Sequence, residues 1–197
     1  MLNEELSMLE LRPIILASGS PRRAEILTSV GWEFTKAVPD IDEAEQPDES
    51  PEKYVQRLAT EKAAAVSSGA PGVPVLGADT TVVLDRQIIG KPVDLPDAKR
   101  MLTLLSGKWH EVLTGVAVVQ NGRQRVGFER TRVKFARMRP DEIDFLAEKG
   151  SPLDKAGAYA VQAQAALFIE GIEGDYWNVV GLPVRLVYEL VNSLSQK

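Results

Sequence analysis

An apolar run, a small-residue turn and a helix start stand in direct succession near the N-terminus, and they limit the possible folds more than any other segment. Residues 14–17 read Ile-Ile-Leu-Ala, which is typical of a buried strand. Ser18-Gly19-Ser20 is a permissive turn, and Ser20-Pro21 combines an N-cap residue with a proline suited to the first helical position. We therefore expect a strand, a tight turn and a helix over residues 21–29, with Gly31 just beyond its end.

Such a turn at a helix N-terminus directs backbone N–H groups and the positive end of the helix dipole toward one point, where an anion can bind. Arg22 and Arg23 lie in the first helical turn, where cations oppose the dipole. Because the two arginines are locally unfavourable, a functional role explains their position better than stability does. We interpret the segment as a phosphate-binding turn. The alternative is an ordinary surface helix with two solvated arginines.

The remaining chain alternates between strand and helix patterns. Asn121-Gly122 separates two strand-like runs and is a strong hairpin signal. Further strands are expected over residues 31–38, 73–84, 109–120, 123–138, 167–172 and 176–180, and further helices over 51–67, 96–106, 140–150 and from Pro183 onward. Residues 39–51 and 153–164 are expected to be loops. The fold class is therefore α/β, with a mixed twisted sheet and flanking helices.

Length and charge exclude several classes of protein. The chain has 197 residues, and we expect a loose N-terminal extension over 1–12 and a single domain over 13–197. No apolar run approaches the ~20 residues of a membrane span. The net charge of −5 argues against nucleic acid or a membrane as the partner, but it allows a phosphorylated ligand in a locally basic cleft. The absence of cysteine fits a cytoplasmic location and excludes thiolate chemistry.

Asp79 interrupts an apolar strand, where aspartate is uncommon. It is either a turn or bulge residue beside Gly77, or a carboxylate at a strand end that faces a cleft. In the second case it could act as a general base or as a ligand of a hard divalent cation, with Glu43 of the acidic loop as a second carboxylate.

The other polar candidates are individually weak. Lys62, Lys91 and Lys155 are each compatible with an exposed surface position. Arg57 and Glu61 have the i,i+4 spacing of a helix-surface ion pair. His110 is the single histidine, so a Ser-His-Asp triad would have to use it, and Ser106 and Asp97 are poorly placed helix-end residues. A P-loop motif is absent.

Together these segments resemble the Maf family of nucleoside triphosphate pyrophosphatases over residues 13–192. The resemblance rests on Ser18-Gly-Ser-Pro-Arg-Arg23, Arg57-Leu-Ala-Thr-Glu-Lys-Ala63, Gly77-Ala-Asp-Thr80, Gly90-Lys-Pro92, Ser106-Gly107 with His110 and Thr114, Pro152-Leu-Asp-Lys-Ala-Gly-Ala-Tyr159 and Asn178-Val-Val-Gly-Leu-Pro183. It implies a fold like that of inosine triphosphate pyrophosphatases, with two lobes around a deep cleft, usually in a homodimer. It also implies hydrolysis of a nucleoside triphosphate to the monophosphate and pyrophosphate with Mg2+ or Mn2+.

The resemblance also implies roles for individual residues. Asp79 matches the proton acceptor, and the polar residues of the family's cleft are matched by Ser18, Arg23, Glu43, Lys62 and Lys91. From these matches and our own interpretation of the residues, we expect the substrate and its phosphates to be bound by Ser18, Arg22, Arg23, Lys62, Lys91 and Lys155, and a divalent metal by Glu43 and Asp79. Arg22, Thr80 and Gln162 match three positions that separate branches of the family, and this combination resembles the branch that acts on dTTP and UTP. The branch for 7-methyl-GTP carries Trp, Gln and Glu there.

Three other functions stay open from the sequence. The chain could be a nucleotide-binding regulatory protein of septum formation with weak catalysis. It could be a pyrophosphatase for another nucleotide such as 7-methyl-GTP. A nucleotidyltransferase would also handle triphosphates at an aspartate and a lysine, but it would need an acceptor.

Overall fold

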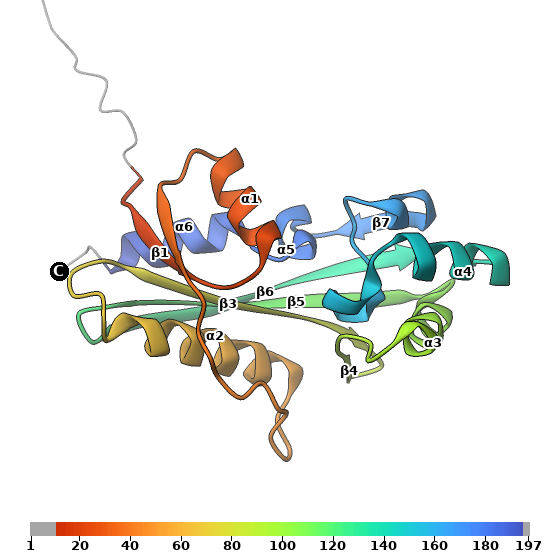
Figure 1. Cartoon of the computed structure of the whole chain (residues 1–197), viewed down its shortest axis with the longest axis horizontal. Coiled ribbons are helices and arrows are strands. Elements are labelled where there is room, and N and C mark those ends of the chain that lie inside the picture. Colours follow the sequence, from red (N-terminus) through yellow and green to blue (C-terminus); the bar gives the residue numbers. More distant parts are fainter. Residues whose placement is uncertain (1–10, 195–197) are drawn as a thin grey trace, which may run out of the picture.

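Three long antiparallel strands run through the middle of the structure, a computed structural model that describes residues 11–194 (Figure 1). They are β3 (Val75–Leu84), β5 (Trp109–Gln120) and β6 (Arg123–Phe135). The turn between β5 and β6 is Asn121-Gly122, with φ of 51° and 75°. This is the hairpin predicted from the Asn-Gly signal.

The N-terminal strand β1 (Ile14–Ala17) extends the sheet on one side. It pairs in parallel with β3 and with β2 (Phe34–Ala37), and α1 (Pro21–Ser29) connects β1 to β2. The order within the described residues is β2-β1-β3-β5-β6-β7, with β7 (Ile169–Glu173) at the far edge. The sheet is therefore mixed, as predicted.

The edge of β3 that faces β1 is open over a short stretch. Pairing between β1 and β3 ends at Ala17 with Gly77, and β4 (Gln87–Ile89) first pairs with β3 at Val82. The β3 backbone between these points has a strand neighbour on its β5 side alone among the described residues. The opening lies beyond the carboxyl end of β1, a position where α/β sheets commonly bind ligands.

Helix α2 (Pro51–Ser67) covers one face of the sheet, which we call the α2 face. It lies unusually close to the strands because two glycines face it. A Cβ atom on Gly77 would lie 2.1 Å from the Ala59 carbonyl oxygen, and one on Gly115 would lie 2.1 Å from the Val55 carbonyl oxygen. These glycines fix the height of α2 above β3 and β5.

The opposite face, the α6 face, carries α1, α5 (Tyr176–Val180) and α6 (Val184–Ser193) (Figure 1). The main core forms here, where Leu16, Leu27, Leu76 and Val187 are fully buried. Helices α3 (Leu95–Leu105) and α4 (Pro140–Lys149) lie at the end of the long strands remote from β1 and β2. Short 3-10 turns follow at Pro152–Asp154, Ala156–Ala158 and Gln164–Phe168.

One prediction of local structure was wrong, and two others differ in detail. Residues Tyr176–Val180 form the helix α5 instead of a strand, because Asp175 caps the segment and the Asn178 side chain is buried. The expected loop over 153–164 contains two of the 3-10 turns. The strand expected from residue 167 begins at Ile169, after the third.

One element was not foreseen, the short strand β4. Its hairpin with β3 turns at Asp85-Arg86, where both residues have positive φ (51° and 67°), without the glycine that would signal such a turn. The predicted N-terminal extension lies outside the described residues, apart from residues 11 and 12. In the described range, no helix is long and apolar enough to cross a membrane.

Candidate active site

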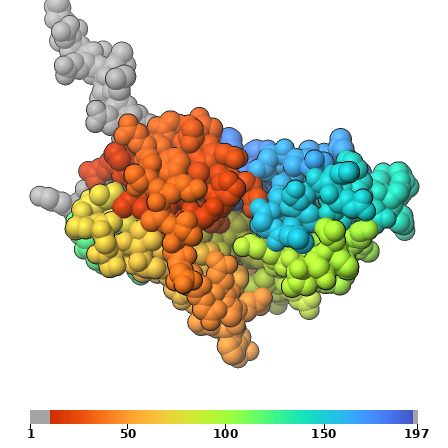
Figure 2. All heavy atoms as spheres, in the orientation of Figure 1, coloured from red at the N-terminus to blue at the C-terminus, as the bar shows by residue number. Residues whose placement is uncertain are grey.

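A cavity of about 390 Å³ opens at the exposed stretch of β3. Figure 2 shows the surface hollowed between the orange α1 region and the cyan segment that follows α4. Every site residue predicted from the sequence lines this cavity, although these residues come from six separate segments: Ser18, Arg22, Arg23, Glu43, Lys62, Asp79, Thr80, Lys91, Lys155 and Gln162. Their individual roles stay predictions.

Alternation along β3 divides the cavity between the two faces of the sheet. Gly77 faces α2, so Asp79 faces the same side, whereas Thr80 and Val82 face the α6 side. The expectation that Asp79 lies at a strand end, or in a turn, is wrong. It lies in the middle of β3 in regular pairing with Gly115, and it reaches the cavity because β1 has already ended.

Lys62 joins the two carboxylates on the α2 face. Its Nζ lies 2.7 Å from Asp79 Oδ1 and 2.6 Å from Glu43 Oε1. Lys62 and Asp79 are both buried, with 7% and 8% of their surfaces exposed, so Lys62 is not the exposed surface lysine of the alternative interpretation. Partial burial acts to raise the pKa of Glu43, but the hydrogen bond and charge of Lys62, helped by Lys91 and Arg23, hold that pKa below its usual range.

Arg23 is the buried cation on the α6 side. Its Nε donates to the Gly181 carbonyl oxygen (2.9 Å), Nη1 to Ser18 Oγ (3.0 Å) and Nη2 to Thr80 Oγ1 (3.1 Å). Burial lowers the pKa of Arg23, and the negative charge of Asp79 opposes that shift. The alternative of a solvated helix arginine is therefore wrong for this residue.

Ser18 is held by the turn that it begins. Its Oγ accepts from Arg23 and from the Ser20 N–H (3.2 Å). Since a hydroxyl has two acceptor sites and one donor, the Ser18 O–H proton remains available to an oxygen in the cavity. Ser20 occupies the N-cap position as predicted, but its side chain makes no capping hydrogen bond.

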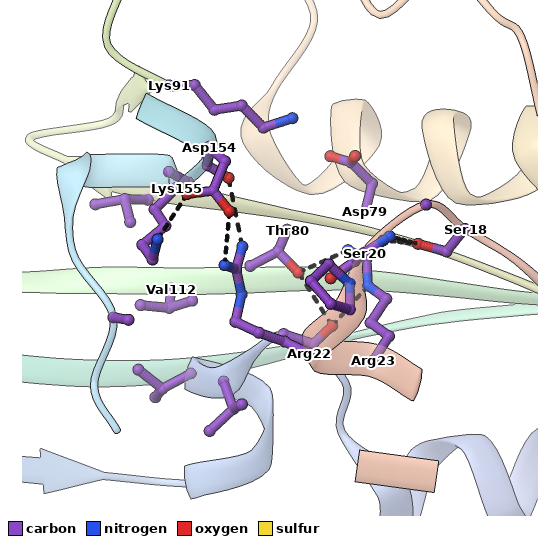
Figure 3. Close-up of a pocket in the computed structure, with 18 of the residues that line it drawn as sticks. Ser18, Ser20, Arg22, Arg23, Asp79, Thr80, Lys91, Val112, Asp154 and Lys155 are labelled. Atoms are coloured by element: carbon purple, nitrogen blue, oxygen red, sulfur yellow. Dashed lines mark hydrogen bonds and ion pairs between the residues drawn. The ribbon is translucent and has the colours of Figure 1, made fainter. Parts of the chain in front are cut away.

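Arg22 and Lys155 share a carboxylate that the sequence did not single out. Arg22 Nη1 lies 3.0 Å from Asp154 Oδ2, and Lys155 Nζ lies 2.6 Å from Asp154 Oδ1 (Figure 3). Asp154 lies in the segment 152–159, one of those that carry the family resemblance. The sequence therefore pointed to this segment, but it assigned no role to Asp154. Lys91 projects toward the cavity in the same view.

The wall on the α6 side is mostly apolar. It consists of Val82, Val112, Val179, Val180 and Tyr159. Gln162 also lines the cavity, exposed, and its amide makes no hydrogen bond to any part of the chain within residues 11–194. An apolar surface with one unpaired amide suits a flat, weakly polar group such as a nucleobase.

Buried hydrogen bonds support this wall from behind. Thr80 Oγ1 lies 2.9 Å from Thr114 Oγ1, and Asn178 Nδ2 donates to the Val112 carbonyl oxygen (3.0 Å) and to Thr131 Oγ1 (2.9 Å). The Asn178 side chain thus ties α5 to β5 and β6.

His110 is not part of a catalytic triad. Its Nε2 lies 2.7 Å from Tyr159 Oη, and its ring packs against Phe135 and Tyr159. Burial lowers the pKa of His110 to about 4, so the ring is neutral near pH 7. Ser106 and Asp97 make local contacts elsewhere: Ser106 Oγ accepts from the Met138 N–H, and Asp97 binds Arg100.

The donor set of the cavity matches a hard divalent cation. Glu43 and Asp79 offer carboxylate oxygens, and the described residues contain no group of three or more acidic, histidine or cysteine ligands. Mg2+ is commonly bound through one or two carboxylates together with substrate phosphates, so two are sufficient.

Comparison with known proteins identifies the family. Residues 13–194 match the family described as Maf-like protein. The chain belongs to the Maf family. A relative from Symbiobacterium thermophilum called dTTP/UTP pyrophosphatase is 49% identical over 94% of this chain and 95% of its own length. A relative with the same name from Hahella chejuensis is 49% identical over 88% of this chain and 88% of its own length. Another, from Bacillus thuringiensis, is 46% identical over 91% of this chain and 95% of its own length.

A solved structure shares the fold. The Staphylococcus aureus Ham1 protein superposes with a TM-score of 0.54 over 92% of this chain and 99% of that chain, at 13% identity. This similarity confirms the predicted fold class, α/β with a mixed twisted sheet and flanking helices.

Proposed function

We propose that this protein is a nucleoside triphosphate pyrophosphatase that hydrolyses dTTP and UTP to the monophosphate and pyrophosphate. The observation that carries the proposal is the cavity at the open edge of β3. It presents Asp79, Lys62 and Glu43 on one side of the sheet and an apolar wall with Gln162 on the other. A nucleoside triphosphate has the same division into a polyanionic end and a flat base. The names of the relatives at 46–49% identity support this choice.

In the proposed reaction, water attacks the α-phosphorus in line with the bond to the β-phosphate. A new P–O bond forms to the water oxygen, the bond from the α-phosphorus to the bridging oxygen breaks, and pyrophosphate leaves. Asp79 accepts the proton of the attacking water. Positioning and charge stabilisation supply most of the rate enhancement in such transfers.

The surrounding cations hold the phosphates and offset the charge of the leaving group. Lys62 and Lys91 face this charge from the α2 side and from the segment after β4, while Ser18 donates its hydroxyl proton to a phosphate oxygen. Arg23 keeps the phosphate-binding turn in place through Ser18 and Gly181, and its charge lies next to Asp79. Arg22 and Lys155 can reach the substrate when Asp154 releases them.

Glu43 and Asp79 would hold Mg2+ or Mn2+ in this proposal. When bound, the cation supplies charge neutralisation at the phosphate oxygens and lowers the pKa of water. The Lys62 ammonium group lies between the same two carboxylates, so it sets their separation and limits their combined negative charge. We expect EDTA to abolish activity, and Mg2+ or Mn2+ to restore it.

A product and substrate analysis tests the proposal. Purified protein with Mg2+ should release monophosphate and pyrophosphate in equal amounts from dTTP and UTP, and 18O from labelled water should enter the monophosphate alone. Orthophosphate as the first product, or label in pyrophosphate, would mean that another bond is cleaved. Nucleotide binding without turnover would identify a regulatory protein, and turnover that requires an acceptor would identify a nucleotidyltransferase.

The homodimer implied by the resemblance and the cytoplasmic location expected from the absence of cysteine stay predictions. Light scattering after size exclusion tests the first and cell fractionation the second. The enzymatic proposal does not depend on either.

A further inference from the structure

The segment that brings Glu43 to the cavity is held by side chains of α2 that do not line the cavity. This segment, residues 42–50, is the second part of the connection between β2 and α2, and among the described residues it has no regular secondary structure. Such a segment needs tertiary contacts to hold one conformation. Glu43 must nevertheless stay in contact with Lys62, so other contacts must hold residues 42–50 in one conformation.

Arg57 of α2 provides the strongest of these contacts. Its Nε and Nη2 donate to the two carboxylate oxygens of Glu49, at 2.7 and 2.8 Å. Nη2 also donates to the carbonyl oxygen of Ala44, at 2.9 Å. The i,i+4 partner expected from the sequence, Glu61, is more distant at 3.3 Å. The interpretation of Arg57 as half of a surface ion pair therefore misses its main partners.

Glu49, which Arg57 binds, is in turn hydrogen-bonded to Gln46 of the same segment. Its carboxylate accepts from the Gln46 N–H (3.3 Å), and its own N–H donates to the Gln46 carbonyl oxygen (3.2 Å). The Glu49 side chain is 8% exposed and that of Arg57 is 17% exposed, so this ion pair is more shielded from water than a typical surface pair. The hydrogen bond from Arg57 lowers the pKa of Glu49, which therefore stays ionised at neutral pH.

A second α2 residue holds the backbone at Glu43 itself. Tyr54 Oη donates to the Glu43 carbonyl oxygen at 3.1 Å. Two successive carbonyl groups, those of Glu43 and Ala44, are thus bound by side chains of one helix. That helix is fixed on the sheet by the close approach at Gly77 and Gly115.

From these contacts we infer that Arg57 is a positioning residue, which holds residues 42–50 so that Glu43 meets Lys62 and Asp79. The inference rests on the proposed function for its catalytic consequence. An arginine is needed because a planar guanidinium can bind both oxygens of a carboxylate and a carbonyl group at once, whereas a lysine ammonium presents a single point charge. Neither Arg57 nor Glu49 lines the cavity, so their effects must pass through the residues that they hold.

The kinetic test uses Arg57→Lys, with Glu61→Gln as the matched control. Arg57→Lys should lower kcat/KM for dTTP by about 10–100-fold, the range found when a group that orients a ligating residue is removed. Glu49→Gln should change activity in the same direction, because it weakens the same pair. Glu61→Gln should stay within about twofold of wild type, since among the described residues Glu61 forms its ion pair with Arg57 and none with residues 42–50.

A double-mutant comparison decides whether Arg57 acts through Glu43. If it does, Arg57→Lys combined with Glu43→Gln loses no more activity than Glu43→Gln alone. Multiplied losses would overturn the inference, because they would show an independent route. Wild-type activity in Glu43→Gln would also overturn it.

Hydrogen exchange of the protein without substrate gives a readout that needs no turnover. Arg57→Lys should speed exchange in residues 42–50 at least about tenfold while β3 and β5 keep their protection, and Glu61→Gln should leave the segment unchanged. If wild-type protein releases no pyrophosphate but the segment opens in Arg57→Lys, the proposed function fails and the positioning role stands. Unchanged exchange in Arg57→Lys overturns the positioning role whatever the activity.

Discussion

Lys62 offsets one of the two negative charges of a pair of carboxylates that would otherwise repel each other in a partly buried place. With Asp79 and Glu43 both within 2.7 Å of its Nζ, the three side chains form one electrostatic unit. Removing the charge of one carboxylate leaves Lys62 paired with the other. A substitution that deletes only the charge of Asp79 is therefore a clean test of its chemistry.

We predict that Asp79→Asn lowers kcat at least ~10²-fold, the contribution of one general base. The fold should be retained, because Lys62 keeps Glu43 as a partner and the amide has the size of the carboxylate. Steady-state kinetics and circular dichroism measure the two effects. The matched control is Asp85→Asn, the same substitution in the exposed turn after β3, where asparagine tolerates the positive φ. Near-normal turnover by folded Asp79→Asn would exclude Asp79 as the proton acceptor.

His110 allows a prediction about stability at acidic pH. Burial lowers its pKa to about 4 in the folded protein, whereas the unfolded chain binds a proton near pH 6.5. Between these values the unfolded state binds more protons, so the free energy of unfolding falls as the pH decreases from 6.5 to 4. The loss from this residue is at most about 3 kcal/mol.

Urea denaturation at pH 7.0, 5.5 and 4.5 checks this expectation. His110→Gln should flatten the dependence above pH 5, because a glutamine amide can still bind Tyr159 Oη but does not titrate. The carboxylates titrate in both proteins and cancel in the comparison. Parallel curves for the two proteins would contradict the assignment of the acid sensitivity to His110.

The sequence identified the site residues better than it described their surroundings. Asp79 was conspicuous because it interrupts an apolar run, but its access to the cavity depends on where β1 stops, and pairing across the sheet is not visible in a local pattern. Arg57 was assigned to Glu61 because i,i+4 spacing reveals only partners within the helix. Its stronger partner, Glu49, precedes the helix in an irregular segment.

Helices and strands with start and stop signals were predicted closely, and those fixed by tertiary contacts were not. The helices opened by Ser-Pro at residues 21 and 51 begin where their signals place them. The segment Tyr176–Val180 has strand-forming residues, but the buried hydrogen bonds of Asn178 and the Asp175 cap override that propensity. The strand propensity of this segment therefore contributed less than the burial and hydrogen bonding of the Asn178 side-chain amide.

The approach of α2 to β3 leads to a third prediction. Gly77→Ala would place a Cβ atom 2.1 Å from a backbone oxygen of Ala59 and 2.7 Å from the Ala63 nitrogen. Backbone atoms cannot rotate away as a flexible side chain can, so α2 must shift. We expect the free energy of unfolding to fall by about 1–3 kcal/mol. Activity should also fall, because the shift moves Lys62 away from Asp79.

Gly69→Ala is the matched control for this substitution. Gly69 lies just beyond α2, and an added Cβ would meet only the Val66 carbonyl oxygen at 3.8 Å, an ordinary contact. Urea unfolding and dTTP hydrolysis are measured for both variants. Equal stability of the two variants would show that the helix is not held at the distance the glycines allow.

The molecule as a whole determines base recognition, because no single element carries it. Arg22 comes from α1, Thr80 from β3 and Gln162 from the segment before the last 3-10 turn, and all three line one cavity. Figure 3 shows Arg22 and Thr80 there. Thr80 is also bound to Arg23 and Thr114, so the position that would separate branches of the family is coupled to the phosphate-binding turn. Sequence spacing cannot reveal this coupling, since the contacts of Thr80 with Arg23 and Thr114 join residues 57 and 34 positions apart in the chain.

The last prediction concerns this specificity. The Gln162 amide can donate and accept at once, which matches the adjacent carbonyl and N–H groups of uracil and thymine. A site that relies on such bonds discriminates strongly, because a wrong base leaves polar groups unpaired. We expect kcat/KM for dTTP and UTP to exceed that for ATP and GTP by at least ~10-fold. Gln162→Glu alone should remove most of this preference, since a carboxylate cannot donate to the base carbonyl.

Adding Arg22→Trp and Thr80→Gln to Gln162→Glu tests whether the three positions act together. The triple variant should favour 7-methyl-GTP over dTTP, because the glutamate can accept from guanine N–H groups and the tryptophan can stack on a positively charged methylated base. Thr80→Gln alone should mainly lower kcat, since it disturbs the hydrogen bonds to Arg23 and Gly181. The measurement is kcat/KM across a panel of canonical and methylated nucleotides. Wild-type preference for GTP or 7-methyl-GTP would refute the assignment to dTTP and UTP, while the release of pyrophosphate would still support the reaction proposed at Asp79.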